Sequence, residues 1–299
     1  LCSALAVTVL ALIALETDAL RRPELSTVDM RFDVRGTEPA PEDVVIVAID
    51  DKTLVEPPKP RWPFPRSHHA RVIRRLAQAG ANVIAYDIQF SEPDPNGADG
   101  DRMLVEATRA AGNVVMATTE VDEHGRPNVF TFDIPTLDVA TEEILPYSRA
   151  VGANSNYLTD TDGRIRRSYF QIQNREAFPL ASARLAQGGT IQPPAGDHAW
   201  IDFVGPPGAI KRLSFVDIRR GTFDPRDVRG KVVVVGATAP SLQDLHATAT
   251  THAGLMPGPE VHANAIHTAL AGFPLRTASS TVNWLLVIAM ALLTPLVAL

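Results

Sequence analysis

The sequence predicts an α/β domain with a mainly parallel central sheet, flanked by helices and set between two hydrophobic chain ends. Four short runs rich in β-branched residues have the length and continuous apolar character of strands buried on both faces, and helix-like segments separate them. The ends of the chain, residues 1–15 and 277–299, carry no charged residue. The polar stretch between them, roughly 260 residues, is long enough for one large domain.

The predicted strands alternate with helices in the order typical of parallel sheets. A strand at 43–49 is followed by a helix that we expect to begin at an N-cap, Ser67, and to end at Gly80. A second strand then gives a strand–helix–strand unit. The remaining strands are expected at 82–87, 113–118 and 231–235, and the remaining helices at 25–34, 102–111, 180–186 and 259–270.

The segment between about residues 148 and 204 has a different pattern. Polar and apolar residues alternate over 169–173, and Asp162-Gly163 marks a tight turn before them. A further short strand is expected at 200–204. We therefore predict an antiparallel hairpin insert within the parallel sheet.

The uncharged ends predict membrane helices. A bilayer-spanning helix needs about 20 apolar residues, so residues 1–15 and 277–299 are expected to be truncated transmembrane helices, with residues 16–276 forming one domain on one side of the membrane. A cleaved signal peptide is the alternative for the first segment. Nearby arginines do not fix the side, because long domains translocate largely regardless of charge.

Composition excludes several classes of function. The chain has 28 Lys and Arg against 34 Asp and Glu, a net charge of −6, and no clustered basic run, which argues against nucleic acid as a partner. The one cysteine, Cys2, lies in the first hydrophobic segment, so the domain has no disulfide framework, no cysteine metal site and no thiol nucleophile. Phosphate-loop, dinucleotide, serine-hydrolase and zinc-protease motifs are absent, and no cofactor is predicted.

Acidic residues follow the predicted strands. Asp50 and Asp51 follow the first strand, Asp87 and Glu92 the second, and Asp244 the last. Ligands of open α/β sheets gather beyond the carboxyl ends of the strands, so these five residues could form one anionic cup for a cation, an amine or a polyol. The alternative is that they cap helices and form turns.

Histidines are concentrated late in the chain, at positions 246, 252, 262 and 267. His262 and His267 are five residues apart and do not share a helix face, so no metal site is predicted. Glu260, Asn264 and His267 do share one face. We include Glu260 and His262 among the candidate ligand-binding residues; the alternative is a polar face turned to solvent or to the hairpin.

Two loops allow two interpretations each. The run Trp62-Pro-Phe-Pro-Arg66 could be a recognition surface, or could pack its aromatic rings beneath its own loop. The loop 94–101 resembles a calcium loop in composition but lacks the acidic residues at the required positions, which favours a plain surface loop.

The order of several motifs resembles the type-two CHASE domain, the cyclase- and histidine-kinase-associated sensory extracellular domain, over about residues 28–275. Those motifs are VVIVAIDDKTL (44–54), WPFPR (62–66), VIAYDIQFSEP (83–93), DTDGRIRR (160–167), GKVVVVGATAP (230–240) and PGPEVHANAI (257–266). The sequence departs from the pattern at 248–251, where Thr-Ala-Thr-Thr replaces an expected Thr-Pro turn.

The resemblance implies a bacterial receptor whose domain lies outside the cytoplasmic membrane. Output modules in the family include adenylate, guanylate and diguanylate cyclases, histidine kinases and serine/threonine kinases, and none is visible in this sequence. The family's ligands are not established, so the resemblance assigns no binding residue.

We therefore expect a non-enzymatic sensory input domain that binds a small molecule or a periplasmic protein, works as a homodimer, and regulates a C-terminal adenylate or guanylate cyclase. A histidine or serine/threonine kinase is the alternative output. Two other functions remain open: a metal-assisted hydrolase using Asp50, Asp87 and Asp244, and an envelope-assembly domain that uses the aromatic–proline loop.

Overall fold

The computed structural model describes residues 21–56, 62–90, 92, 94–119, 151–251, 254–279, 281–282, 284–285 and 288–289. The chain divides into two compact units. One comprises residues 1–36 and 275–299, and the other residues 37–274.

The smaller unit contains the helix α2 (Arg21–Arg35), which confirms the helix predicted at 25–34. Gly36 ends it with a left-handed backbone, φ +77°, and its amide donates to the Phe32 carbonyl oxygen at 2.9 Å. No helix among the described residues is long and apolar enough to cross a membrane. The span predicted at 1–15 lies outside the described residues, as does most of 277–299.

The larger unit is built on a six-stranded sheet in which every neighbouring pair is parallel. Its strands, in spatial order, are β4 (Val151–Asn154), β3 (Val114–Thr118), β2 (Val83–Asp87), β10 (Val232–Ala237), β1 (Val44–Ile49) and β9 (Arg212–Ser214). The strands predicted at 43–49, 82–87, 113–118 and 231–235 are confirmed. Their continuous apolar character reflects burial on both faces.

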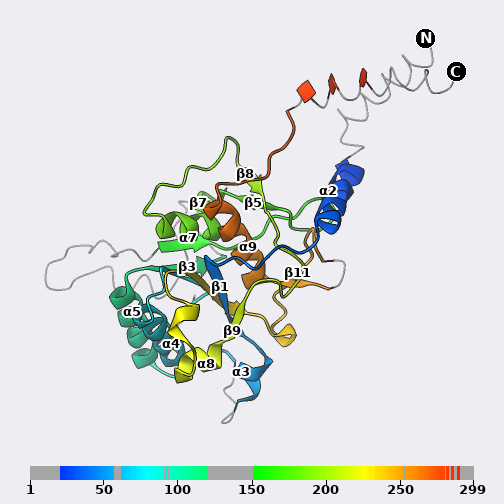
Figure 1. Ribbon diagram of the computed structural model, residues 1–299. Coiled ribbons are helices and arrows are strands. Elements are labelled where there is room, and N and C mark those ends of the chain that lie inside the picture. Colours follow the sequence, from blue (N-terminus) through cyan, green and yellow to red (C-terminus); the bar gives the residue numbers. More distant parts are fainter. Residues whose placement is uncertain are drawn as a thin grey trace. The chain divides into compact units, whose positions relative to one another are not determined.

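Helices cover both faces of this sheet (Figure 1). The helices α4 (Arg66–Gln78), α5 (Ala98–Ala111) and α8 (Phe215–Arg220) lie on one face, and α7 (Phe178–Ala186) and α9 (Gly258–Leu270) on the other. Alternate residues of β1 belong to separate cores: Val45 and Val47 pack on the α4 side, Val44 and Ile46 on the α9 side. The predicted α/β class with a mainly parallel sheet is confirmed.

The strand of this sheet that comes last in the sequence, β10, lies between the first two, β1 and β2. After β1 and β2 the chain continues into helices on the α4 face, whereas after β10 it continues into α9 on the opposite face. Connections that leave neighbouring strands for opposite faces open crevices at the carboxyl edge of the sheet. This topology therefore creates a crevice on each side of β10.

The predicted antiparallel insert is partly confirmed. Short antiparallel pairs join β5 (Arg167–Tyr169) to β8 (His198–Trp200) and β6 (Gln171–Ile172) to β7 (Arg175–Glu176). The strand β4, however, lies within the same stretch and pairs in parallel with β3, so the parallel sheet extends further than predicted.

The strand predicted at 200–204 lies earlier in the chain, as β8, which ends at Trp200. Residues 201–204 form no strand, because side chains of α9 take the backbone hydrogen bonds that a partner strand would need. The Asp202 amide donates to Thr268 Oγ1 and the Val204 amide to Asn264 Oδ1, both at 2.9 Å. This segment is therefore fastened to a helix.

The start of α4 also differs from the prediction. The helix begins at Arg66, after Pro65, and Ser67 is not its cap. The Asp94 carboxylate instead accepts the Arg66 amide at 3.0 Å, and Asp101 accepts the Asp94 amide at 2.8 Å. Acids of the loop 94–101 thus organise the chain locally.

The run Trp62-Pro-Phe-Pro-Arg66 packs its aromatic rings inward. Phe64 is 2% exposed, and the Trp62 ring meets its edge at a centroid distance of 5.1 Å. The Arg66 guanidinium lies 4.5 Å from the Phe90 ring centre and donates to the Glu92 carbonyl oxygen at 2.9 Å. These contacts join the loop to the chain that follows β2.

We predict that Arg66→Lys lowers the free energy of unfolding by about 1–3 kcal/mol. A lysine ammonium cannot both stack on the Phe90 ring as a planar guanidinium does and keep the hydrogen bond to the Glu92 carbonyl oxygen. Denaturant unfolding would measure the change. The matched control is Arg102→Lys, whose exposed side chain forms an ion pair with Asp99, and whose effect we expect to be within about 0.5 kcal/mol. Equal effects at both positions would contradict this account of Arg66.

Candidate functional site

Two regions at the carboxyl edge of the sheet contain five of the seven predicted site residues, one region on each side of β10. The first, the acid–histidine cluster, consists of Asp87, Tyr157, Asp244, His246 and His262. Asp87 is the last residue of β2, and His262 lies in the first turns of α9. Topology brings these residues together from segments separated by as many as 175 positions, because β2 and β10 are neighbours.

Tyr157 contacts both imidazoles of the cluster. Its ring centre lies 4.6 Å from that of His246 and 4.5 Å from that of His262, and its hydroxyl donates to the Gly258 carbonyl oxygen at 2.6 Å. His246 Nε2 lies 2.8 Å from Asp244 Oδ1, while His262 Nε2 is 3.7 Å from Asp87 Oδ1. His246 thus has a close carboxylate partner, and His262 has only a distant one.

Burial sets the protonation states of the cluster. It raises the pKa of Asp87 well above the usual value, and the nearby Asp244 carboxylate raises it further. Burial, with repulsion from His246, lowers the pKa of His262 to about 3, although the Ser155 backbone acts in the opposite direction. The pKa of Tyr157 is raised by burial and by both carboxylates. At neutral pH His262 is therefore neutral, and Asp87 holds its proton to higher pH than an ordinary aspartate.

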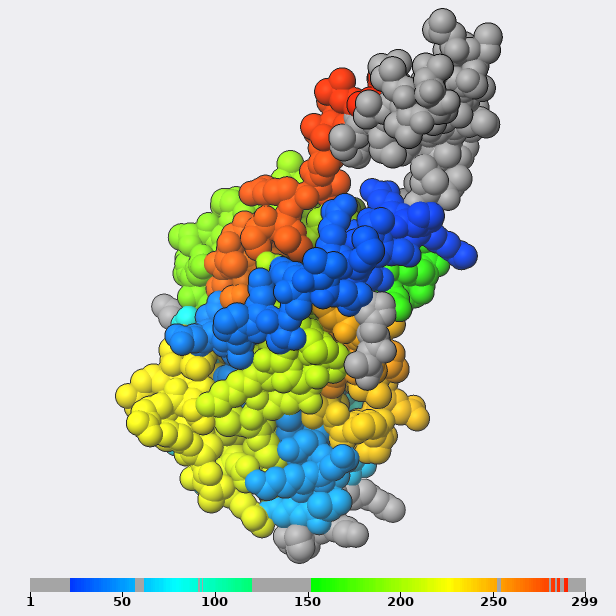
Figure 2. Space-filling model, turned by 45° about the vertical axis from the view of Figure 1, so that its right-hand side comes forward, coloured from blue at the N-terminus to red at the C-terminus, as the bar shows by residue number. Residues whose placement is uncertain are grey.

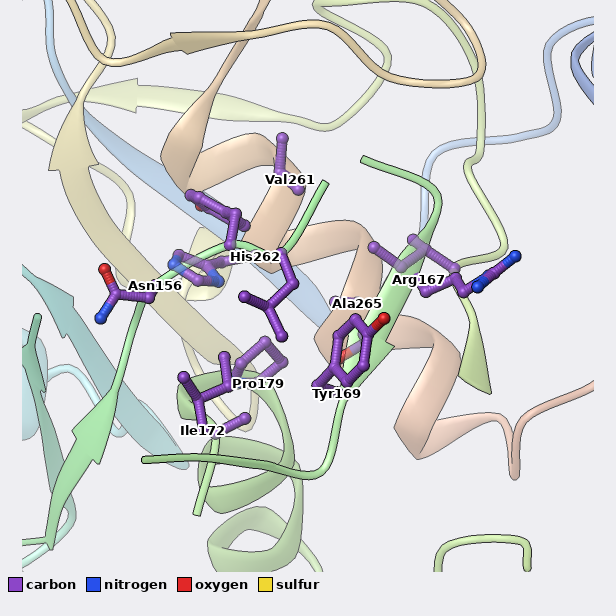
Figure 3. Close-up of a pocket in the computed structure, with 13 residues that line it drawn as sticks. Asn156, Arg167, Tyr169, Ile172, Pro179, Val261, His262 and Ala265 are labelled. Atoms are coloured by element: carbon purple, nitrogen blue, oxygen red, sulfur yellow. The ribbon is translucent and has the colours of Figure 1, made fainter. Parts of the chain in front are cut away.

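A narrow slit adjoins the cluster (Figure 3). His262 and Asn156 lie toward one end of it, and Tyr169 and Arg167 toward the other. Its volume is ≈ 20 Å³, which is about the room that a single water requires. The slit is too small for an organic ligand.

The second region is a cavity of ≈ 470 Å³ at the carboxyl ends of β1 and β10, lined also by Arg212 of β9, and is here called the switch-point cavity. Its volume lies within the range of small-molecule sites, about 300–1,000 Å³. The residues that line it are Asp50, Asp51, Pro207, Arg212, Thr238, Ala239, Pro240, Leu245, Leu255 and Pro257.

Asp50 has a structural role as well as a place in this cavity. Its Oδ1 atom caps α3 (Asp51–Val55) by accepting the Thr53 amide at 2.8 Å and the Thr53 hydroxyl at 2.7 Å. The Ser214 hydroxyl donates to the same oxygen at 2.8 Å. The capping alternative therefore applies to Asp50, yet its Oδ2 atom accepts no hydrogen bond from the part of the chain that the structure describes.

Glu260 lies outside both regions, fully buried on α9. It accepts the amides of Gly208, at 2.8 Å, and Ile210, at 3.4 Å, and forms an ion pair with Arg212. Glu260 and Asn264 therefore fasten the segment 204–210 to α9. His267, on the same predicted face, is partly exposed and pairs with Asp43 instead. Glu92 has an exposed side chain, and His252 lies outside the described residues.

The five strand-end acids therefore do not form a single cup. Asp50 and Asp51 line the switch-point cavity, while Asp87 and Asp244 belong to the acid–histidine cluster. The insertion of β10 separates the ends of β1 and β2 by two strand spacings, about 10 Å. No group of three or more His, Cys, Asp or Glu side chains that could hold a metal ion occurs within the described ranges.

Sequence reasoning missed Tyr157 and Arg212. Tyr157 follows β4, a strand of four residues whose pattern is too short to recognise, and Arg212 begins β9, which has three. Only knowledge of these edge strands would have placed Tyr157 in the cluster or Arg212 beside the cavity.

A two-stranded ribbon connects the two regions. It pairs β11 (Leu245–His246) with β12 (Met256–Pro257). Leu245 and Pro257 line the switch-point cavity, whereas His246 contacts Tyr157 in the cluster. A displacement of this ribbon would therefore change both regions together.

These features define an α/β domain with a cavity of about 470 Å³ at a topological switch point. A family model described as CHASE2 domain matches residues 5–297, and the chain belongs to that family. CHASE2 domains are sensory extracellular domains found in signalling receptors. Neither curated proteins nor solved structures yielded a match.

We predict that Asp87→Asn stabilises the domain increasingly as pH rises. A carboxyl group whose pKa is raised in the folded state contributes stability below its ordinary pKa of 3.8, and that contribution is lost as pH rises through the raised pKa. The neutral amide avoids this loss. Melting temperatures across a pH series would show the variant's advantage growing with pH, and an advantage independent of pH would contradict the assignment. The exposed Asp99→Asn is the control.

We predict the opposite pH dependence for His262→Gln. A histidine with a depressed pKa contributes stability above pH 6.5 that is lost as pH falls toward about 3. At 1.36 kcal/mol per pKa unit the full loss is about 5 kcal/mol. Denaturant unfolding between pH 7 and pH 4 would show a smaller loss in the variant than in the native chain. The partly exposed His198→Gln should behave like the native chain.

Proposed function

We propose that this chain is the extracellular input domain of a bacterial membrane receptor and that it binds a small molecule in the switch-point cavity. The observation that carries the proposal is the cavity itself, ≈ 470 Å³ at the sheet edge where α/β folds hold their ligands. Membership of a family of sensory domains agrees with it.

The ribbon β11–β12 provides the connection from ligand to output. Leu245 and Pro257 line the cavity, and α9 begins directly after Pro257. A ligand that prefers one arrangement of the ribbon shifts the equilibrium between two states of the domain by its difference in affinity for them. The helix α9 directly follows the ribbon and precedes the C-terminal segment of the chain. A movement of the ribbon would therefore be passed through α9 to that segment.

The output that we propose is an adenylate or guanylate cyclase C-terminal to this segment, with a histidine or serine/threonine kinase as the alternative. We further propose that the receptor works as a homodimer, since most such outputs act in pairs. The geometry gives less support to the hydrolase alternative, because Asp50 is separated from Asp87 and Asp244 by β10. It gives less support to the assembly alternative, because Phe64 of the aromatic–proline loop is buried.

We predict that Leu255→Trp in the full-length receptor changes its output severalfold, because the larger side chain fills part of the cavity and biases the ribbon. Cyclic nucleotide production, or autophosphorylation for a kinase, is the measurement. The matched control is Val55→Trp, since Val55 is also exposed and apolar but does not line the cavity. Unchanged output in Leu255→Trp, with normal folding and membrane insertion, would contradict the proposed function.

A further inference from the structure

We infer that the switch-point cavity takes an organic cation, namely a protonated amine attached to an apolar body. The inference rests on the proposed function and specifies the chemical class of the ligand. Three features of the cavity carry it: the balance of charge, the fixed orientation of Asp50, and the apolar wall.

The charge around the cavity is negative. Asp50 and Asp51 contribute two carboxylates, and Arg212 contributes one guanidinium. The Arg212 charge is balanced from behind by Glu260, a fully buried carboxylate with which it forms an ion pair. The two aspartates are thus left uncompensated by the other residues that line the cavity. A cation gains from this field and an anion is repelled.

Asp50 is held in position before any ligand arrives. Three donors converge on its Oδ1 atom, from the Thr53 amide, the Thr53 hydroxyl and the Ser214 hydroxyl. The carboxylate therefore keeps one orientation, and Oδ2 remains available as an acceptor. A fixed charged acceptor binds an ammonium group without the entropy loss of ordering a free side chain.

Most of the other residues that line the cavity are apolar. Pro207, Pro240 and Pro257 supply rigid surface, and two leucines complete the wall. Leu255 is 51% exposed, which leaves a large apolar side chain for a ligand to cover. An apolar body bound here removes this surface from water, which favours binding.

A bare metal ion fits the cavity poorly. The volume of ≈ 470 Å³ is that of an organic molecule, and the described residues contain no group of three or more side chains suited to a metal. A neutral polyol would not neutralise the negative charge of the two aspartates. A protonated amine with an apolar body matches the negative charge, the volume and the apolar surface of the cavity.

The test uses three molecules with one carbon skeleton: 3-methylbutylamine, 3-methylbutanol and 3-methylbutanoate. Each is titrated into the full 299-residue chain in mild detergent at pH 7, with binding followed by calorimetry and thermal shift. We expect saturable binding of the amine and at least tenfold weaker binding of the alcohol and the carboxylate. Equal or tighter binding of the carboxylate, or no binding of the amine at millimolar concentration, would overturn the inference.

Asp50→Asn is the decisive variant, because asparagine retains the capping oxygen and is itself a good N-cap. Its amide group replaces the free oxygen with a donor, so we expect about 10- to 100-fold weaker amine binding, as for loss of a charged hydrogen bond. Asp99→Asn, an exposed acid on α5, is the matched control and should bind as the native chain does. Native-like affinity in Asp50→Asn would overturn the inference.

A second variant keeps the inference testable if Asp50→Asn does not fold. Leu255→Ala removes exposed apolar wall without touching α3, and we expect it to weaken amine binding severalfold. If the amine fails to bind while Leu255→Trp still changes receptor output, the ligand class is wrong and the sensory function stands. If both fail, the proposed function itself is wrong.

Discussion

The insertion of β10 between β1 and β2 is the constraint on which the rest of this domain depends. Its residues pair with both neighbours in register, so that Val232 lies opposite Val44 on one side and Val83 on the other. Both crevices exist because the chain leaves β10 toward α9 while it leaves β1 and β2 toward the opposite face. Close packing at this point needs Gly236, where an added Cβ would lie 2.4 Å from Pro259 Cγ.

The polar residues of α9 show how a buried helix can hold a long irregular segment. Glu260, Asn264 and Thr268 are spaced four residues apart and are all buried. Each accepts backbone amides from residues 202–210. Because buried backbone groups need partners, these side chains replace the neighbouring strand that this stretch lacks. The arrangement also places Arg212 at the cavity with its charge already balanced.

The central strands could be predicted from sequence because burial on both faces leaves a continuous apolar signature, as in Val44–Ile49 and Val232–Ala237. The edge strands β4 and β9 could not, since their four and three residues leave too short a pattern. The acids could be predicted to lie at the carboxyl edge because each one follows a predicted strand. Their division into two regions depends on the order of the strands in the sheet. Sequence alone could not show that β10 separates Asp50 from Asp87.

The late position of β10 in the chain also sets the order of events during synthesis. Until residues 232–237 have emerged, β1 and β2 have no partner at the edges that will face each other. Contacts between such distant segments form slowly, and unpaired strand edges are prone to association with other chains. Until β10 has paired with both neighbours, the chain therefore exposes two unpaired strand edges at the centre of its future sheet, which is the stage at which it is most open to association with other chains.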